Sequence, residues 1–176
     1  QGLSLTSKGD DVAPGTAFRT GHVINNDEQE TQKAHFISVM ALEDNTVVNF
    51  GDFKNNVVFH NTPTTGGTSD PISVTLNAGE SYVIATHMDE NMTVPNDVNG
   101  TLVTSDKDIV VNCGSWLAGN DPGGKRDIGV DQLVPVGAVS TEYAFIAGQG
   151  NAANERALVV ATEDGTSGYL WYLKSE

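Results

Sequence analysis

Residues 34–50 read AHFISVMALEDNTVVNF, a β-rich run that ends in a Glu-Asp-Asn turn and continues into a second β-rich run. The pattern returns at residues 156–166, where RALVVA leads through Thr162 into the turn EDGT. Glycine at position 165 in place of Asn45 indicates a turn position with positive φ, which Asn and Gly tolerate best. The two turns lie 120 residues apart, 163 minus 43. A fixed period of this kind predicts a repeat architecture.

The openings of the two copies also correspond. Residues 15–18 read GTAF and residues 140–143 read STEY, 125 residues apart, 140 minus 15. Only the beginning of the second copy follows. We therefore predict a β unit at residues 1–136 and the first strands of a second, incomplete unit at residues 137–176. On this interpretation the chain is a window from a longer array, or a subunit whose last strands pair with a partner.

The overall fold class follows from the remaining runs. Short β-rich stretches separated by Gly, Asn, Asp and Pro dominate, and we find no amphipathic helix. We predict hairpins that pair residues 72–76 with 80–85, 100–104 with 109–111, and 46–50 with 56–59. About eight strands per period favour an all-β, Greek-key-like sandwich. Propeller-like blades are the alternative.

Charge and cysteine content restrict the class of partner. The net charge is −14, from 23 Asp and Glu against 9 Lys and Arg, and this field repels phosphate backbones and anionic lipid. The sequence lacks an apolar stretch of about 18 residues, so we expect neither nucleic-acid binding nor direct membrane insertion. The single cysteine, Cys113, excludes an intramolecular disulfide. The composition favours an extracellular protein of the bacterial cell surface.

The longer loops are the predicted recognition sites, chiefly residues 87–99 and 114–131, because a rigid sheet holds them in place. In the second loop Trp116 is a candidate for stacking on a sugar or protein partner, with Asp121, Arg126 and Asp131 fixing polar groups. The alternative is structural: Trp116 plugs one end of the sandwich while Arg126 pairs with a nearby aspartate.

Catalytic signatures are missing from the sequence. There is no metalloprotease HExxH, nucleophile elbow or phosphate-binding loop, and the four histidines share no metal-ligand spacing. We expect His35 to be a structural residue, either packed or partly exposed. The acidic loop offers oxygen ligands for Ca²⁺ from Asp89, Glu90 and Asp97, and the alternative is a solvated acidic edge. No other cofactor is expected.

The end of the chain suggests assembly. Residues 169–173 (Tyr169, Leu170, Trp171, Tyr172 and Leu173) would form an exposed apolar edge if no strand covered them. We predict that this segment completes the sheet of a neighbouring copy by strand addition, which would make the chain a filament subunit.

An ordered set of motifs resembles a known family. The motifs are TSKG at 6–9, GTAFRTG at 15–21, FISVMALEDNTVVNF at 36–50, VTLNAGESYVI at 74–84, GTLVTSDKDIVVNCGS at 100–115, RDIGVDQLVPV at 126–136 and TEY at 141–143. Together they resemble the N-terminal type of domain of IgGFc-binding proteins. That domain also occurs in large secreted surface proteins of the Bacteroidota, often with gliding-motility-type sorting regions. The resemblance implies an all-β extracellular module and supplies no catalytic residues.

The sequence as a whole therefore predicts a non-enzymatic structural or adhesive module of a bacterial cell-surface protein. Its expected partners are a protein or glycan on a surface and neighbouring copies or repeats of itself. A carbohydrate-binding module is the alternative, followed by a carbohydrate-active enzyme, which would need two carboxylates about 5–9.5 Å apart.

Overall fold

The computed structural model describes residues 14–22, 34–54, 57–60, 71–86, 97–118, 127–146 and 157–169. These segments are all-β, as predicted, with one short 3₁₀ helix. The strands are β1 (Gly15–Arg19), β2 (His35–Ala41), β3 (Thr46–Gly51), β4 (Ile72–Leu76), β5 (Ser81–Ala85), β6 (Leu102–Ala118) and β7 (Asp127–Gln132), followed by the helix η1 (Val136–Ala138).

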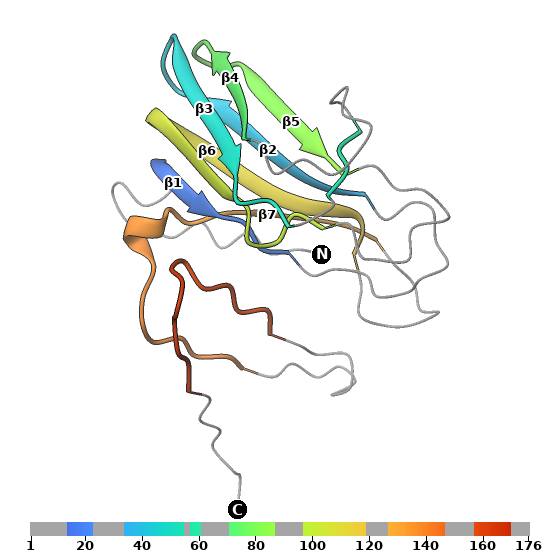
Figure 1. Cartoon of the computed structure of the whole chain (residues 1–176), viewed down its shortest axis with the longest axis vertical. Helices are drawn as coiled ribbons and strands as arrows, with labels where there is room; N and C mark the ends of the chain where they lie inside the picture. The colour runs from blue at the N-terminus through green and yellow to red at the C-terminus, as the bar shows by residue number, and fades with distance from the viewer. Residues whose placement is uncertain are drawn as a thin grey trace, which may run out of the picture.

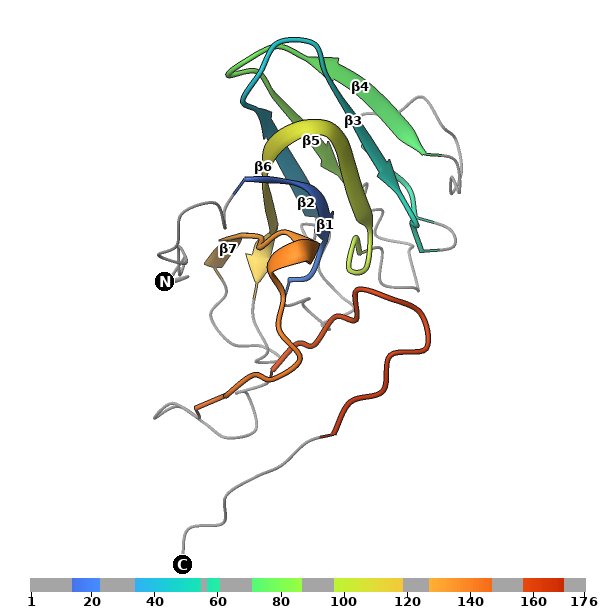
Figure 2. The ribbon, with the colours of Figure 1, turned by 90° about the vertical axis from the view of Figure 1, so that its left-hand side faces the viewer.

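The strands form one antiparallel sheet organised around β6 (Figure 1). This strand is 17 residues long and pairs with β1, β2, β3 and β7. Its first part pairs with β3 and β1, and its second part pairs with β2 and β7. Strand β4 extends the first half beside β3, and β5 extends the second half beside β2. The sheet curls strongly where β6 passes from one half to the other, and the result is a half-barrel (Figure 2).

The predicted hairpin between residues 100–104 and 109–111 is wrong, because both runs belong to β6. The buried residues Val103, Ile109 and Val111 all occupy odd positions and lie on the core face of one strand, although the pairing of this strand with β1 shifts register between Thr104 and Ile109. The polar residues between them also have partners in an extended chain. Ser105 is paired with Val48, and the N–H of Val47 donates to Oδ1 of Asp106 at 2.7 Å.

The other two predicted hairpins are also wrong, although the turn predicted at residues 77–80 is in place. The turn at residues 77–80 forms, with Gly79 at φ 80°, but it sends β4 to β3 and β5 to β2. The turn at residues 42–45 likewise connects strands of different halves. These two arches lie against each other: the N–H of Gly79 donates to the carbonyl of Ala41 at 2.8 Å. Beyond β3, Phe59 forms a bridge with Thr86 instead of pairing with β3.

The hydrophobic core lies in the concavity of the curled sheet, between its two halves. Phe18, Ile37, Phe50 and Ile109 are among its fully buried side chains. The halves face each other across this core as two layers would. They remain joined through β6, however, so the described residues form one sheet, and the two separate sheets of a sandwich are not shown.

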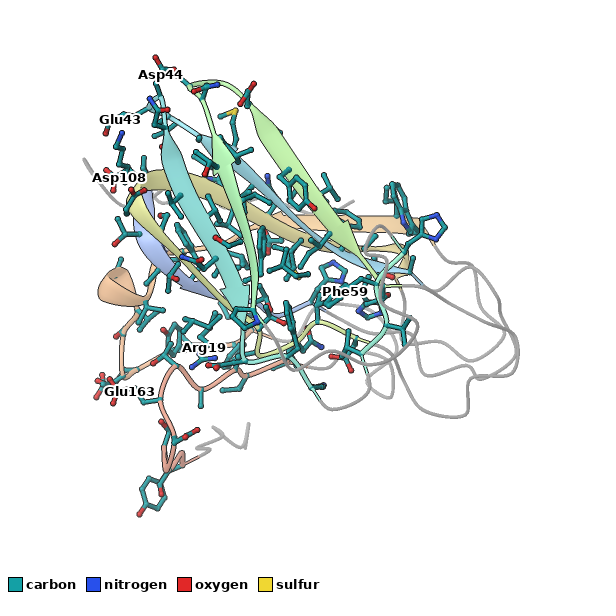
Figure 3. All side chains as sticks on the ribbon, turned by 45° about the horizontal axis from the view of Figure 1, so that its top comes forward. Arg19, Glu43, Asp44, Phe59, Asp108 and Glu163 are labelled. Carbon is teal, nitrogen blue, oxygen red and sulfur yellow. The ribbon has the colours of Figure 1, made fainter. Side chains whose placement is uncertain are left out.

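The two ends of the sheet differ in character. The arch end, which carries the turns 42–45 and 77–80, gathers Glu43, Asp44 and Asp108, whereas Phe59 lies toward the other end (Figure 3). Acidic side chains at the arch end accept hydrogen bonds from backbone N–H groups. For example, Oδ1 of Asp44 accepts a hydrogen bond from the N–H of Ala78 at 3.0 Å. We call the opposite end, from which β2, β5 and β7 extend into the longer connections, the loop end.

The turn that defines the sequence repeat has the same local geometry in both places. Asn45 and Gly165 have φ values of 56° and 73°, which confirms the predicted positive φ at both positions. Thr46 and Thr166 each donate from Oγ1 to the carbonyl three residues earlier at 2.7 Å. Residues 157–169 nevertheless form no strand. The division into units at residues 136 and 137 therefore stays a prediction.

The segment at residues 157–162 rests on the end of β1. Nε of Arg19 donates to the carbonyl of Thr162 at 3.4 Å, and its Nη1 pairs with Oδ2 of Asp52 at 2.6 Å. A Cβ on Gly21 would meet Cγ2 of Val160 at 2.6 Å, so the segment approaches the backbone closely there.

Candidate functional site

The convex side of the half-barrel over β5, β2, β6 and β7 is the candidate site, and we call it the outer face. Alternation along each strand places there the side chains that point away from the core. On β6 we count this face from Val110 onward, and none of its side chains is charged, although the chain carries a net charge of −14; the preceding outward residue of β6, Asp108, lies at the arch end. The outer face consists of Phe36, Ser38 and Met40 of β2; Ser81, Val83 and Ala85 of β5; Val110, Asn112, Gly114 and Trp116 of β6; and Ile128, Val130 and Gln132 of β7.

An aromatic pair occupies the loop-end side of this face. The rings of Trp116 and Phe36 have centroids 5.1 Å apart and are tilted by 39°. Such pairs contribute about 0.5–1.5 kcal/mol beyond the area that they bury. Phe36 is only 7% exposed, whereas Trp116 is 50% exposed. Phe36 therefore serves as a packed support, and one side of the indole ring stays available to a ligand.

Gly114 makes this packing feasible. A Cβ at this position would meet Cζ of Phe36 at 2.6 Å and Cγ2 of Val130 at 2.9 Å. Because glycine has no side chain, the phenyl ring of Phe36 and the Val130 methyl groups close directly over the β6 backbone. Val130 and the neighbouring Ile128 are themselves exposed, so the apolar surface continues from the aromatic pair onto β7.

A polar row lies beside the aromatic pair. The register places Ser38 of β2 opposite Asn112 of β6, and Asn112 opposite Gln132 of β7. Directly opposite residues on one face have Cβ atoms about 4.5–5.5 Å apart, so these side chains are neighbours. All three are partly exposed. The outer face therefore combines a stacking surface with hydroxyl and amide groups.

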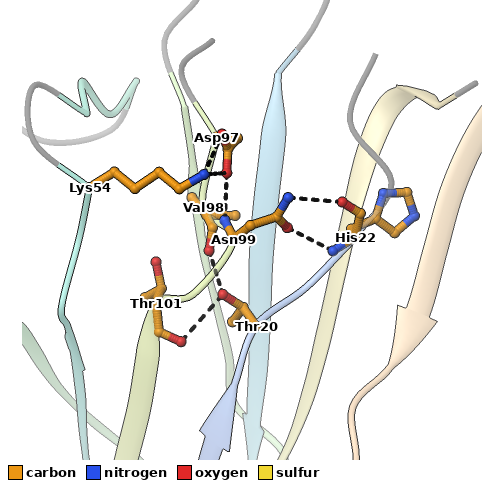
Figure 4. A network of polar contacts seen from close by, with 7 residues as sticks. All are labelled: Thr20, His22, Lys54, Asp97, Val98, Asn99 and Thr101. Atoms are coloured by element: carbon orange, nitrogen blue, oxygen red, sulfur yellow. Dashed lines mark hydrogen bonds and ion pairs between the residues drawn. The ribbon is translucent and has the colours of Figure 1, made fainter. Parts of the chain in front are cut away.

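A network of polar contacts fixes the chain at the loop end (Figure 4). Nζ of Lys54 donates to both carboxylate oxygens of Asp97, at 2.7 and 2.8 Å. The N–H of Asn99 donates to Oδ1 of the same carboxylate at 2.8 Å. The Asn99 side chain accepts from the N–H of His22 at 2.7 Å and donates to its carbonyl at 3.0 Å. Residues 97–99 are thereby joined by hydrogen bonds to the segments that follow β1 and β3.

Thr20 extends this network into the interior. Its buried hydroxyl donates to the carbonyl of Val98 and contacts the carbonyl of Thr101 at 3.3 Å. Backbone bonds join the same segments, because Thr20 donates to Thr101 at 3.0 Å and Gly100 donates to Thr20 at 2.8 Å. These contacts satisfy the backbone where β6 begins, which any buried polar segment requires.

Two buried ionisable groups lie near this network. Burial lowers the pKa of His35 from 6.5 to about 4, and the charge of Asp97 opposes the shift only partly. His35 is therefore neutral at pH 7 and buried, the packed alternative of the two predicted for a structural histidine. Burial raises the pKa of the Cys113 thiol to about 12, which leaves it without the thiolate that a nucleophile needs. Among the described residues, no group of His, Cys, Asp and Glu side chains is arranged to hold a metal ion.

Comparison with known protein families gives a match over nearly the whole chain. Residues 11–170 match the family described as IgGFc binding protein. The chain belongs to this family. The resemblance of the ordered sequence motifs is thus confirmed at the level of the family.

Membership in the IgGFc binding protein family indicates a non-catalytic binding or structural domain, and such domains are typical of secreted proteins. Searches of curated proteins and of solved structures gave no match. Within the described segments, no helix combines the length and the apolar character needed to cross a membrane.

The structure separates the residues predicted to bind a ligand in this IgGFc-binding domain. Trp116 lies on the outer face and is half exposed, so it does not plug the end of the core. Asp131 is paired with Cys113, a core residue, so its side chain starts on the opposite side of the sheet. Asp121 and Arg126 lie outside the described residues. Trp116 and Asp131 are therefore not brought together on one face.

The predicted calcium site and the predicted assembly segment are also only partly described by the structure. Both carboxylate oxygens of Asp97 accept from Lys54, so a cation there would have to displace that ammonium group. Asp89 and Glu90 lie outside the described residues, and the calcium site stays a prediction. In the predicted assembly segment Tyr169 is 85% exposed, while Leu170, Trp171, Tyr172 and Leu173 lie outside the described residues.

Sequence reasoning missed the companions of Trp116. Phe36, Ser38, Asn112 and Gln132 come from three strands far apart in the chain, and nothing in their local sequence marks them as neighbours. One signal was present: Gly114 interrupts an apolar strand run, and a glycine within a strand often marks a close approach to the backbone.

Proposed function

We propose that this chain is a non-catalytic adhesive or structural module of a bacterial cell-surface protein, and that it binds a surface-borne protein or glycan through its outer face. The half-exposed Trp116, supported by Phe36 on an uncharged face, is the observation that carries this proposal. Tryptophan is enriched among residues that dominate binding energy. The acidic residues elsewhere on the surface favour the solubility of the protein and disfavour nonspecific association.

We expect Trp116→Ala to weaken binding at least about tenfold, because truncating a central aromatic residue removes about 2 kcal/mol or more. The measurement is biolayer interferometry on immobilised mucin, fibronectin, collagen and the Fc fragment of immunoglobulin G, which the family's name makes a necessary member of the panel. Leu42→Ala is the matched control, since Leu42 is also an exposed apolar residue but lies in the turn at the arch end, off the outer face. Equal binding by wild type and Trp116→Ala on every bound surface would contradict the proposal.

A second role is supported by the repeat: we propose that the module belongs to a multi-unit array or filament. Phe18 and Val39 are 0% and 1% exposed, whereas their counterparts Tyr143 and Val159 are 63% and 75% exposed. In the first unit Phe18 and Val39 belong to the hydrophobic core, on strands β1 and β2 that both pair with β6. We infer that a neighbouring copy or unit covers the second set, as the second layer of a sandwich would.

For the array we expect light scattering of the isolated chain to give a mass above the 18.6 kDa monomer. The double variant Tyr143→Ser with Val159→Ser is expected to be monomeric, because it removes the exposed apolar side chains that drive association. Met40→Ser, at a similarly apolar exposed position on the outer face, serves as the control and should associate like the wild type. A wild-type mass equal to the monomer across the accessible concentration range would count against assembly between copies.

A further inference from the structure

We propose that the outer face binds an uncharged saccharide, with Trp116 stacking on a sugar ring and Ser38, Asn112 and Gln132 hydrogen-bonding its hydroxyl groups. This inference rests on the proposed function and specifies its ligand class. Nothing in the family match assigns these residues a role.

The first argument is the geometry of the two adjoining rows. Ser38, Asn112 and Gln132 stand directly opposite one another on three neighbouring strands, which are spaced about 4.8 Å apart. The row therefore extends across about 10 Å of the sheet. Trp116 lies four residues beyond Asn112 on the same face of β6. An aromatic ring beside a line of short polar groups presents a stacking surface and lateral hydrogen bonds together.

The second argument is that the polar row has no structural role to explain it. Within the part of the chain that the structure describes, the side chains of Ser38, Asn112 and Gln132 make no hydrogen bond with other residues. A side-chain amide both donates and accepts, and a serine hydroxyl does the same. Sugar hydroxyl groups have the same dual character, so each of these side chains can pair with them in either sense.

The third argument is charge. The chain has 23 acidic and 9 basic residues, yet none of the residues that form the outer face is charged; Asp108, two positions before Val110 on the same side of β6, lies at the arch end, away from Trp116. A basic side chain would be expected there if the ligand were a sulfated or sialylated glycan, because buried or closely paired anions need a compensating charge. The surrounding field of −14 repels such anions further. The face therefore fits a neutral saccharide.

Gly114 lies between Trp116 and the polar row, and its lack of a side chain keeps the surface between them flat. The Cβ that it lacks would meet Phe36 and Val130, and any larger side chain would rise between Trp116 and the polar row. The floor between the stacking ring and the amides is consequently made of the Phe36 ring and the Val130 methyl groups, which cover Gly114. A saccharide on Trp116 can thus reach Asn112 across this apolar floor, with no side chain of residue 114 between them.

The opposite half of the sheet provides a matched control. Asn49 of β3 stands opposite Ser73 of β4 and Thr104 of β6, which forms a second row of amide and hydroxyl groups across three strands. Among the described residues on that half, no exposed aromatic side chain accompanies the row. Asn49→Ala therefore removes the same group from the same kind of strand position without touching the proposed site.

The test begins with a glycan array that carries neutral, sialylated and sulfated oligosaccharides, probed with the whole chain. The best neutral oligosaccharide is then titrated by isothermal titration calorimetry. We expect neutral ligands to be selected, Trp116→Ala to weaken binding at least about tenfold, and Asn112→Ala or Gln132→Ala to weaken it about two- to tenfold. Asn49→Ala should bind like the wild type. Circular dichroism and thermal melts verify that each variant is folded.

Three outcomes would overturn the inference: no neutral oligosaccharide bound at millimolar concentration, preferential binding of anionic glycans, or unchanged binding by the polar-row variants. The failure of the proposed function is a different result. If Trp116→Ala abolishes binding to a glycan-free protein surface while Asn112→Ala has no effect, the adhesive role stands and the saccharide inference fails. If Trp116→Ala has no effect on any bound surface, both fail.

Discussion

A Gly114→Ala variant is expected to lose about 3 kcal/mol of unfolding free energy, at the upper end of the usual cost of overpacking. The added Cβ would meet Phe36 and Val130 as well as the carbonyl oxygen of Gly129. The side chains can rotate away, but the carbonyl belongs to β7, which pairs with β6 at this point. Relief therefore requires the strands to separate where β6 joins the second half of the sheet.

Urea denaturation followed by circular dichroism measures this loss, and Gly137→Ala is the control. A Cβ on Gly137 would find no atom within 4 Å, and this glycine does not have a positive φ. Its substitution is expected to change stability by no more than about 0.5 kcal/mol. Equal midpoints for the two variants would show that the close approach at Gly114 is not a determinant of stability.

Acidification is expected to destabilise the fold by about 3 kcal/mol through His35 alone. Its pKa is about 4 in the folded chain and 6.5 in the unfolded chain. Between these values the unfolded state binds a proton that the folded state does not. The stabilising contribution is therefore complete above pH 6.5 and is lost progressively as the pH falls to 4, at about 1.4 kcal/mol per unit of pKa difference.

The measurement compares unfolding free energies of wild type and His35→Gln from pH 7.5 to 4. Carboxylates also titrate in this range, so the difference between the two curves, not either slope alone, reports on His35. We expect the wild type to lose about 3 kcal/mol more than the variant over this interval. Parallel curves would mean that protonation of His35 is not linked to folding.

The proposed functional residues divide between those that sequence reasoning reached and those that it did not. Trp116 was recognisable as a candidate because an aromatic residue stood in a glycine-rich stretch. Its grouping with Asp131 failed, because strand register places Asp131 opposite the core residue Cys113. The polar row could not be anticipated, since a one-residue change of register would move every one of its side chains to the other face.

The sequence by itself determined the local features: the all-β class, most strand positions, and the positive φ at Asn45 and Gly165. These depend on residue alternation and on backbone sterics within a few positions. Only the tertiary structure decided which strands pair, why residues 105–108 stay extended, and which face Trp116 occupies. Such choices are made by long-range packing, because β6 pairs with strands that lie up to 94 residues earlier in the chain, 109 minus 15. Local propensity does not distinguish those partners, so neither the pairing nor the outer face was available without the fold.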